Sequence, residues 1–298
     1  MDRLILILVL LLVGKGLSRL SAFPGDTFKA LANFVIYVSV PALILVQVPK
    51  LPISSSVLTP IVMPWVMLVA SAVAVLLVSR VFRFRRRTTG ALMLLVPLGN
   101  TSFLGLPMIE AFLGQDAIPY ALLYDQFGTF LAFATYGSFI AAYYSRQQRP
   151  AALSLIKRVA LFPPFLALLL AFAFRAWPYP HRVEPLLQSV GATLVPIVMV
   201  AVGFKLSFRL SWRRSRALVT GLVLKMVVAP LFALAICYLG GLDGPAVRVS
   251  VFEAGMPSMI TAGALAISEK LDPKLAATMV GYGIVLSFGS LALLARVL

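Results

Sequence analysis

Apolar residues fill this chain in long runs, and short polar or basic segments separate the runs. A helix needs roughly 17 to 25 mostly apolar residues to cross the hydrocarbon core of a bilayer. Ten runs come near that length, so the pattern predicts an all-helical membrane protein with ten spans. The predicted spans are Leu4–Leu20, Thr27–Val48, Thr59–Ser79, Thr88–Phe112, Ile118–Tyr144, Val159–Trp177, Pro185–Phe204, Ala217–Leu239, Pro245–Ile267 and Pro273–Leu298.

The first run is the weakest of the ten, because only Leu4–Val13 is uninterrupted before Gly14, Lys15 and Gly16. A short apolar core after Arg3 is also typical of a signal peptide. No small-residue cleavage site follows it closely, however. We therefore favour a membrane span over a signal peptide.

Two runs are interrupted by residues that break helices. The fourth contains glycines, a proline and small polar side chains over Gly99–Pro107, and the ninth contains a similar stretch over Glu253–Met259. Irregular backbone is tolerated inside a membrane only where protein buries it or where it lines a cavity. A helix that restarts there presents free N–H groups and a positive dipole end, which attract an anion. Matched broken spans therefore point to the binding site of a secondary transporter.

The candidate binding residues at these breaks are Thr101, Gly105 and Pro107 in the first stretch, and Pro257 and Ser258 in the second. The two prolines suit the first turn of restarting helices, where a missing N–H does no harm. The competing interpretation is that each proline only kinks a packed helix.

The two halves of the chain share short motifs in the same order. Val38–Ile44 matches Thr193–Met199 at an offset of 155 positions, and Phe127–Gly128 matches Tyr282–Gly283 at the same offset. The prolines of the two breaks match at an offset of 150. Five spans in each half give the second half the opposite orientation, so the motifs predict an inverted repeat.

Composition agrees with a membrane protein, because 61% of the residues are hydrophobic and 12% are charged. The net charge of +16 comes from short basic clusters between the runs, such as the arginines of Arg80–Arg87. Such clusters are typical of topology signals rather than of surfaces that bind nucleic acid. Most lysines and arginines fall in alternate connections, so the positive-inside rule places both termini on the non-cytoplasmic side.

Catalytic chemistry finds little support in the sequence. The single cysteine excludes an internal disulfide, and the single histidine argues against a histidine-based metal site or catalytic pair. No other set of catalytic residue types converges in a motif. The sequence therefore predicts neither an enzyme nor a bound cofactor or metal.

The interrupted stretches also carry a resemblance to a known family. GNTSFLGLP at Gly99–Pro107, EAGMPSMITAG at Glu253–Gly263, VSVPAL at Val38–Leu43 and Lys225 ahead of Pro230 resemble the auxin efflux carrier family. That family includes plant PIN-type auxin exporters and bacterial malonate-carrier-like permeases, and the resemblance covers essentially the whole chain.

The resemblance implies two inverted five-helix repeats, residues 1–150 and 151–298, with helices 4 and 9 broken and crossing at their prolines. It implies a scaffold bundle of helices 1, 2, 6 and 7 and a transport bundle of helices 3–5 and 8–10 that moves like an elevator. It also implies a homodimer surrounded by lipid in a bacterial inner (plasma) membrane.

Two polar residues match the family position by position. Asn100 matches the asparagine that contacts the substrate carboxylate in the auxin exporters, and Gln126 resembles a glutamine of the fifth helix near the same pocket. Both side chains also suit hydrogen bonds that only hold helices together.

Few ionisable residues fall inside the spans, so each is a functional candidate. Asp125 and Glu253 are candidates for a coupled proton, because burial favours the neutral form of a carboxyl group. Lys225 suits pairing with one of these acids or attracting the substrate, but a long lysine also reaches toward the membrane interface. Glu110 follows Pro107 by three residues and suits the positive end of the restarting helix.

Together these features predict a secondary transporter of a small organic anion, a carboxylate, held between the two breaks and Asn100. A proton or the membrane potential is the expected driving force, because no cluster of oxygen ligands for sodium stands out. One alternative is a sodium-coupled carrier of the bile acid symporter type, which shares the crossed-helix architecture. Another is a sensor or assembly subunit that keeps the fold without transport. A pore is disfavoured, because the spans hold no repeated ring of like charges.

Overall fold

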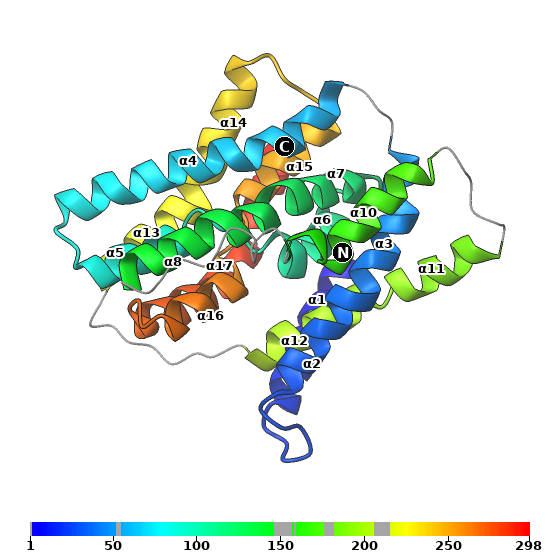
Figure 1. Cartoon of the computed structure of the whole chain (residues 1–298), viewed down its shortest axis with the longest axis horizontal. Helices are drawn as coiled ribbons and strands as arrows, with labels where there is room; N and C mark the ends of the chain where they lie inside the picture. Colours follow the sequence, from blue (N-terminus) through cyan, green and yellow to red (C-terminus); the bar gives the residue numbers. More distant parts are fainter. Residues whose placement is uncertain (1, 52–54, 146–156, 158, 176–181, 206–214) are drawn as a thin grey trace. The chain divides into compact units, whose positions relative to one another are not determined.

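The computed structural model describes residues 2–51, 55–145, 157, 159–175, 182–205 and 215–298 (Figure 1). All regular structure in these residues is helical, apart from one isolated antiparallel bridge between Gly99 and Ser258. The expectation of an all-helical chain is therefore confirmed for the described part. The predicted repeat boundary after residue 150 and the predicted end of the sixth span at Trp177 lie outside the described residues.

The chain divides into two compact units. Unit 1 comprises Met1–Ile53, Ser102–Leu122 and Lys157–Leu206, and unit 2 comprises Ser54–Thr101, Leu123–Ile156 and Ser207–Leu298. Each unit thus draws on both halves of the sequence.

Unit 1 is built from short and medium helices. They are α1 (Asp2–Leu17), α2 (Thr27–Phe34), η1 (Val35–Ser39), α3 (Val40–Gln47), η2 (Val48–Lys50), η4 (Thr101–Gly105), α6 (Leu106–Phe112), η5 (Gln115–Ala117), α7 (Ile118–Leu123), α10 (Pro163–Ala173), α11 (Val183–Gly191) and α12 (Leu194–Lys205). The first residue of η4 and the last residue of α7 fall in unit 2.

A close crossing of α1 and α12 organises unit 1. A Cβ atom on Gly14 would lie 2.1 Å from the carbonyl oxygen of Val200, and one on Gly203 would lie 2.1 Å from that of Leu11. Small residues at membrane helix interfaces let two backbones approach closely. The two helices therefore meet backbone to backbone, and α1 is packed as a structural helix of unit 1.

The matched proline motifs meet in the same unit. Pro41 lies in the first turn of α3 and Pro196 in the first turn of α12. The hydroxyl groups of Ser39 and Thr193, which precede these prolines, form a hydrogen bond of 2.8 Å. The start of α3 is thereby tied to the start of α12.

Unit 2 contains the longest helices. Its elements are η3 (Ser55–Val57), α4 (Leu58–Val81), α5 (Arg86–Leu95), η6 (Tyr124–Phe130), η7 (Phe133–Gly137), α8 (Ser138–Ser145), α13 (Ser215–Val223), η9 (Leu224–Val228), α14 (Ala229–Leu239), α15 (Pro245–Ala254), α16 (Ile260–Ser268) and α17 (Pro273–Val297).

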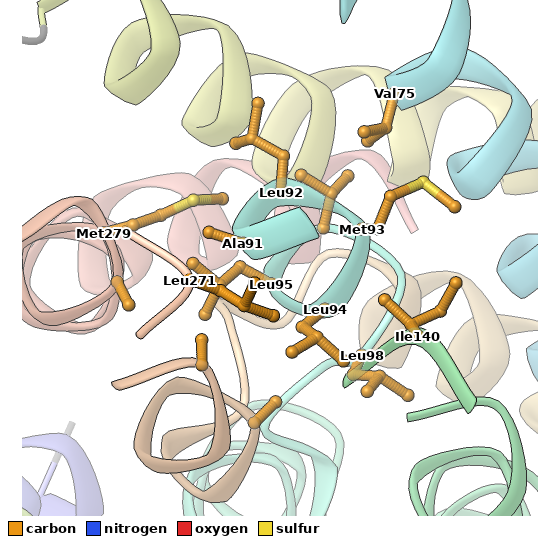
Figure 2. Packing of buried hydrophobic residues seen from close by; sticks show 14 of the residues in the cluster. Val75, Ala91, Leu92, Met93, Leu94, Leu95, Leu98, Ile140, Leu271 and Met279 are labelled. Carbon is orange, nitrogen blue, oxygen red and sulfur yellow. The ribbon is translucent and has the colours of Figure 1, made fainter. Parts of the chain in front are cut away.

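Helix α5 lies at the centre of the core of unit 2. It is buried without interruption from Thr89 to Leu95, as expected of a helix that is apolar on all sides. It packs against α4, α8, α13, α16 and α17. Figure 2 shows its leucines among Val75, Ile140 and Met279 from the neighbouring helices. This packing holds the end of α5, and the break that follows it, in a fixed position within the unit.

Five helices are long and apolar enough to cross a bilayer: Thr27–Lys50, Ser55–Val81, Val183–Lys205, Arg216–Leu239 and Pro273–Val297. Their bounds lie within a few residues of the second, third, seventh, eighth and tenth predicted spans. The first and sixth predicted spans contain shorter apolar helices, and the fifth is helical with two π-helical stretches. The chain is therefore a polytopic membrane protein, and the count of ten spans stays a prediction.

Candidate functional site

Two interrupted helical segments cross within unit 2. The backbone between α5 and η4 is not helical, nor is the backbone between α15 and α16. The N–H of Asn100 donates to the carbonyl oxygen of Pro257 at 2.8 Å, and the N–H of Met259 donates to that of Leu98 at 3.0 Å. The two breaks thus satisfy backbone groups of one another, as buried backbone requires.

The crossing point differs from the predicted one. Pro257 lies directly before the bridge residue Ser258, three residues before α16 begins, and not in the first turn of that helix. Its carbonyl group accepts a hydrogen bond there, and its missing N–H is not needed. Pro107 is the second residue of α6 in unit 1, after helical backbone has restarted at Thr101. The first-turn position was therefore predicted correctly for Pro107 and wrongly for Pro257, and the match of the two prolines in a repeat stays a prediction.

The crossing holds polar side-chain atoms that are buried without a partner. The side chains of Asn100 and Ser258 are 3% and 1% exposed. Within the described part of the chain, Asn100 Nδ2 and Ser258 Oγ have no hydrogen-bond partner. No side chain in that part caps the N-terminus of α16, which begins two residues after Ser258. Leaving a buried donor unpaired costs about 1–3 kcal/mol. A ligand with acceptor oxygens would therefore bind favourably here.

Three of the predicted residues form a hydrogen-bond network beside the crossing. Thr101 Oγ1 donates to Asp125 Oδ1 at 2.5 Å, and Gln126 Nε2 donates to Asp125 Oδ2 at 2.7 Å. All three side chains are buried. Hydrogen bonds to a carboxylate are stronger than neutral ones. The network therefore holds Asp125 of η6 next to the first break.

Lys225 lies inside the unit and does not reach toward an interface. The residue is 4% exposed, and its Nζ donates to the carbonyl oxygen of Ala254 at 3.4 Å. Ala254 is the last residue of α15, where a positive charge interacts favourably with the helix dipole. A Cβ atom on Gly99 would lie 3.2 Å from the same Nζ. The ammonium group therefore binds the backbone next to the second break and lies near the first.

Glu253 is the remaining charged residue of the crossing, and it is fully buried in the last turn of α15. Neither of its carboxylate oxygens has a hydrogen-bond partner among the described residues. The structure thus brings Asn100, Thr101, Asp125, Gln126, Lys225, Glu253, Pro257 and Ser258 together in unit 2.

The crossing is closed in this conformation. A cavity of about 10 Å³ lies against Gly99, Thr101, Lys225 and Glu253. That volume holds about one water molecule and no organic substrate. Within the described chain, no three His, Cys, Asp or Glu side chains are grouped so as to hold a metal ion.

The other three predicted residues, Gly105, Pro107 and Glu110, belong to unit 1. Pro107 and Glu110 line a cavity of about 590 Å³ within that unit, with walls that are partly polar and partly apolar. This cavity has room for a small organic molecule.

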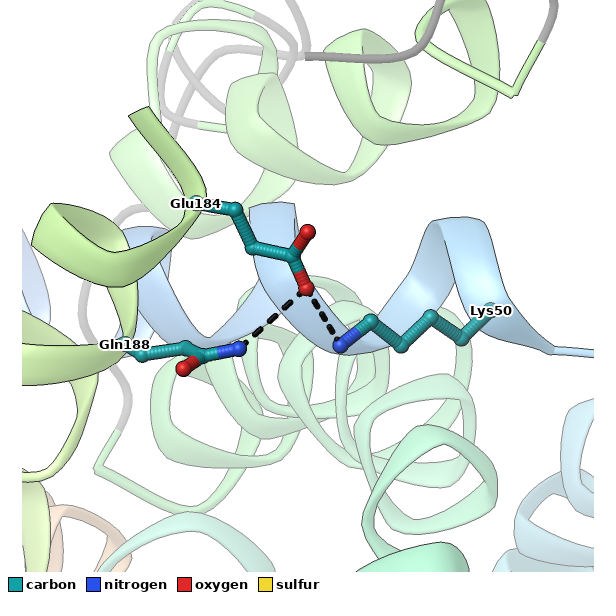
Figure 3. A network of polar contacts seen from close by, with 3 residues as sticks. All are labelled: Lys50, Glu184 and Gln188. Atoms are coloured by element: carbon teal, nitrogen blue, oxygen red, sulfur yellow. Dashed lines mark hydrogen bonds and ion pairs between the residues drawn. The ribbon is translucent and has the colours of Figure 1, made fainter. Parts of the chain in front are cut away.

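The charged residues of this cavity do not favour an anion. Its described lining contains Lys50, Glu110 and Asp116. The Lys50 ammonium is paired with Glu184 at 2.6 Å, and Gln188 Nε2 donates to the same carboxylate oxygen at 3.2 Å (Figure 3). Two carboxylates and one paired ammonium leave no excess positive charge. The crossing in unit 2 is therefore the better candidate for an anion site.

The structure adds residues that the sequence did not assign to the site. Trp65 Nε1 donates to the carbonyl oxygen of Phe127 at 2.9 Å, which fixes the backbone of η6. A Cβ atom on Gly128 would lie 2.1 Å from a proline side chain of α4, and one on Gly283 would lie 3.1 Å from Cβ of Pro257. Both glycines allow close packing beside the crossing. The available signal was the match of Phe127–Gly128 with Tyr282–Gly283, which by itself indicates only a repeat.

Comparison with known proteins adds the family. The model of the Membrane transport protein family matches residues 1–295. An uncharacterized transporter of Methanothermobacter thermautotrophicus is 31% identical, over 98% of this chain and 96% of the relative. An uncharacterized transporter of Methanocaldococcus jannaschii is 27% identical, over 94% of this chain and 92% of the relative. A Rhizobium meliloti protein named "Putative malonate transporter" is 26% identical, over 84% of this chain and 80% of the relative.

Proposed function

The chain belongs to the membrane transport protein family, that of the auxin efflux carriers, and we propose that it is a secondary transporter of a small organic anion. The proposed substrate is a carboxylate, and a proton gradient or the membrane potential drives its passage through a bacterial inner (plasma) membrane. The name of the Rhizobium meliloti relative includes malonate, which is such a carboxylate.

One observation carries the proposal of an anion site. Asn100 Nδ2 and Ser258 Oγ are buried donors without a described partner, on the two backbone segments that pair at the crossing. A carboxylate has two oxygens with several lone pairs, so it accepts from both donors at once. The positive end of α16 and the ammonium group of Lys225 favour the negative charge of the ligand.

The finer architecture belongs to the same proposal. Ten spans form two inverted repeats, both termini lie away from the cytoplasm, and a scaffold bundle in a homodimer supports a moving transport bundle. The two compact units support this division. They separate the same helices as the two bundles, except that Ser102–Leu122 clusters with unit 1.

A pair of serine variants tests the anion site. S258A removes the unpaired hydroxyl, whereas S250A removes an equally buried hydroxyl that donates to the carbonyl oxygen of Ala246 at 2.7 Å. A hydrogen bond to a charged group contributes about 1.5–3 kcal/mol, so S258A is expected to weaken carboxylate binding by roughly 10- to 150-fold. S250A is expected to bind carboxylates as the wild type does. S258A is also expected to unfold no more easily than the wild type, because the lost hydroxyl had no partner to leave behind.

The measurements are thermal shifts of the purified protein with malonate and a panel of other carboxylates, followed by uptake into proteoliposomes. Two results would overturn the proposal: no carboxylate raises the unfolding temperature, or S258A and S250A bind with equal affinity. Binding without flux would indicate a sensor. Tighter binding in sodium, at fixed pH and ionic strength, would indicate a sodium-coupled carrier.

A further inference from the structure

The proposed anion site leaves the side chain of Glu253 without a role. This carboxyl group is fully buried, and neither oxygen has a hydrogen-bond partner within the described part of the chain. A charged carboxylate in such surroundings has lost its favourable solvation by water without gaining a hydrogen bond in return. Burial of the neutral acid costs far less free energy, because an uncharged polar group loses less solvation than a charged one.

Few charged or titratable groups face Glu253. Asp125 and Tyr124 of η6 and Lys225 of η9 interact with it electrostatically. Its own helix packs against α4, α14, α17 and η3, and no charged group of these elements is seen to interact with it among the described residues. The local charge is therefore set by one ammonium group and two carboxyl groups.

Hydrogen bonding distinguishes the two acids. The carboxylate of Asp125 accepts bonds from Thr101 and Gln126, which stabilise its negative charge. Glu253 accepts none from the described residues. With Asp125 and Lys225 both charged, a proton on Glu253 leaves this group of three side chains neutral, whereas its loss leaves one excess negative charge in a buried site.

We propose that Glu253 is the proton-binding residue of this transporter and that the neutral acid carries a proton together with an anion bound at the crossing. The inference rests on the proposed function and names its coupling residue. Glu253 precedes Ala254, whose carbonyl group binds Lys225, and the Lys225 ammonium lies near Gly99, the bridge partner of Ser258. A bound anion therefore adds negative charge close to Glu253 and stabilises the neutral acid. By reciprocity the protonated protein binds the anion more tightly.

The first experiment observes the proton directly and needs no substrate. Infrared difference spectra between alkaline and acidic pH are recorded for the purified wild type, for E253Q and for E269Q. Glu269 is a matched control, since it is a half-buried glutamate of unit 2 at the end of α16. The wild type and E269Q are expected to show the band of a buried protonated carboxyl group, and E253Q is expected to lose it. A band that persists in E253Q, or that D125N abolishes instead, would overturn the inference.

A second variant keeps the test decisive if E253Q does not fold. E253D retains a carboxyl group one methylene shorter, so its band is expected to shift relative to the wild type. An unshifted band in E253D would place the proton elsewhere and would overturn the assignment to Glu253.

The second experiment measures coupling in proteoliposomes with malonate as the probe. Wild-type vesicles are expected to take up protons with malonate, and malonate affinity is expected to rise toward acid pH by up to about tenfold per pH unit, the slope for one bound proton. E253Q is expected to exchange malonate without proton movement and without that pH dependence, and E253D to restore proton uptake.

The two proposals fail in different ways. Proton uptake with malonate that is undiminished in E253Q would overturn the role of Glu253 and leave the anion transporter standing. A Glu253 band in the infrared spectra of a protein that transports no carboxylate would overturn the proposed function and leave the proton site standing.

Discussion

Replacement of Thr101 by valine tests whether the network around Asp125 stabilises the crossing. The variant keeps the shape of the side chain and removes the hydroxyl that donates to Asp125 at 2.5 Å. Both side chains are 1% exposed, so the bond lies away from bulk water. A hydrogen bond to a charged group contributes about 1.5–3 kcal/mol. Because the bond is buried and its acceptor is a carboxylate, we expect T101V to lower the free energy of unfolding by about 1.5–3 kcal/mol.

Two further variants isolate the hydroxyl group from the packing. T101S keeps the donor and loses one methyl group, which is expected to cost about 1 kcal/mol. T129V removes a hydroxyl from a second buried threonine, which lies in η6 and bonds to no other side chain in the described residues. That change is expected to be nearly neutral. When the variants are unfolded by heat and by denaturant in the same detergent, T129V should be the most stable, T101S less stable and T101V the least stable.

The ranking has two outcomes that refute this reasoning. Equal losses in T101S and T101V would mean that packing of the methyl group, and not the hydroxyl, accounts for the effect. A T101V protein as stable as T129V would mean that Asp125 does not depend on Thr101, and the account of the network would then be wrong.

Two glycine pairs give further predictions. G14A places a Cβ atom 2.1 Å from a backbone carbonyl of α12 and is expected to cost about 1–3 kcal/mol of unfolding free energy. G16A, with no atom within 4 Å, is expected to gain up to about 1 kcal/mol from helix propensity, and equal stabilities by thermal unfolding would refute the close crossing. G283A places a Cβ atom 3.1 Å from Cβ of Pro257 and is expected to weaken malonate binding, whereas G289A meets no atom within 4 Å and is expected to leave it unchanged. Calorimetric titration with malonate checks this pair, and equal affinities would count against the site.

The sequence predicted the long spans well because their physical cause is local. Thr27–Lys50 and Pro273–Val297 are helices whose length and apolar composition can be read directly from the chain. Both breaks were also predictable, since glycine, proline and small polar residues interrupt otherwise apolar runs. The register of the crossing was not, because Pro107 resembles Pro257 in the sequence while the pairing joins Gly99 to Ser258 through backbone atoms. Main-chain atoms are the same in nearly every residue type, so the amino-acid sequence does not reveal which backbone segments pair when they lie far apart in the chain.

The position of Lys225 shows a second limit of the sequence. A lysine inside an apolar run is equally suited to reaching an interface and to binding within a bundle. Its bond to the carbonyl group of Ala254 depends on where α15 ends. The C-terminus of α15 lies where the break begins. Whether η9, which carries Lys225, packs against that break is decided by tertiary structure. The sequence alone therefore does not identify the hydrogen-bond partner of Lys225.

The break and the candidate site have one structural cause. Ser250 and Ser287, two buried serines in intact helices of unit 2, are satisfied by their own helices: Ser250 donates to Ala246, and Ser287 donates to Ile284. Ser258 has no helical carbonyl to accept its hydroxyl, because the backbone around it pairs with the other break instead. Buried polar groups without partners are rare in proteins and call for an explanation. Here the bridge that satisfies the backbone of both breaks leaves the Ser258 hydroxyl and the amide of Asn100 available, so a substitution that restored a continuous helix would remove the anion site together with the break.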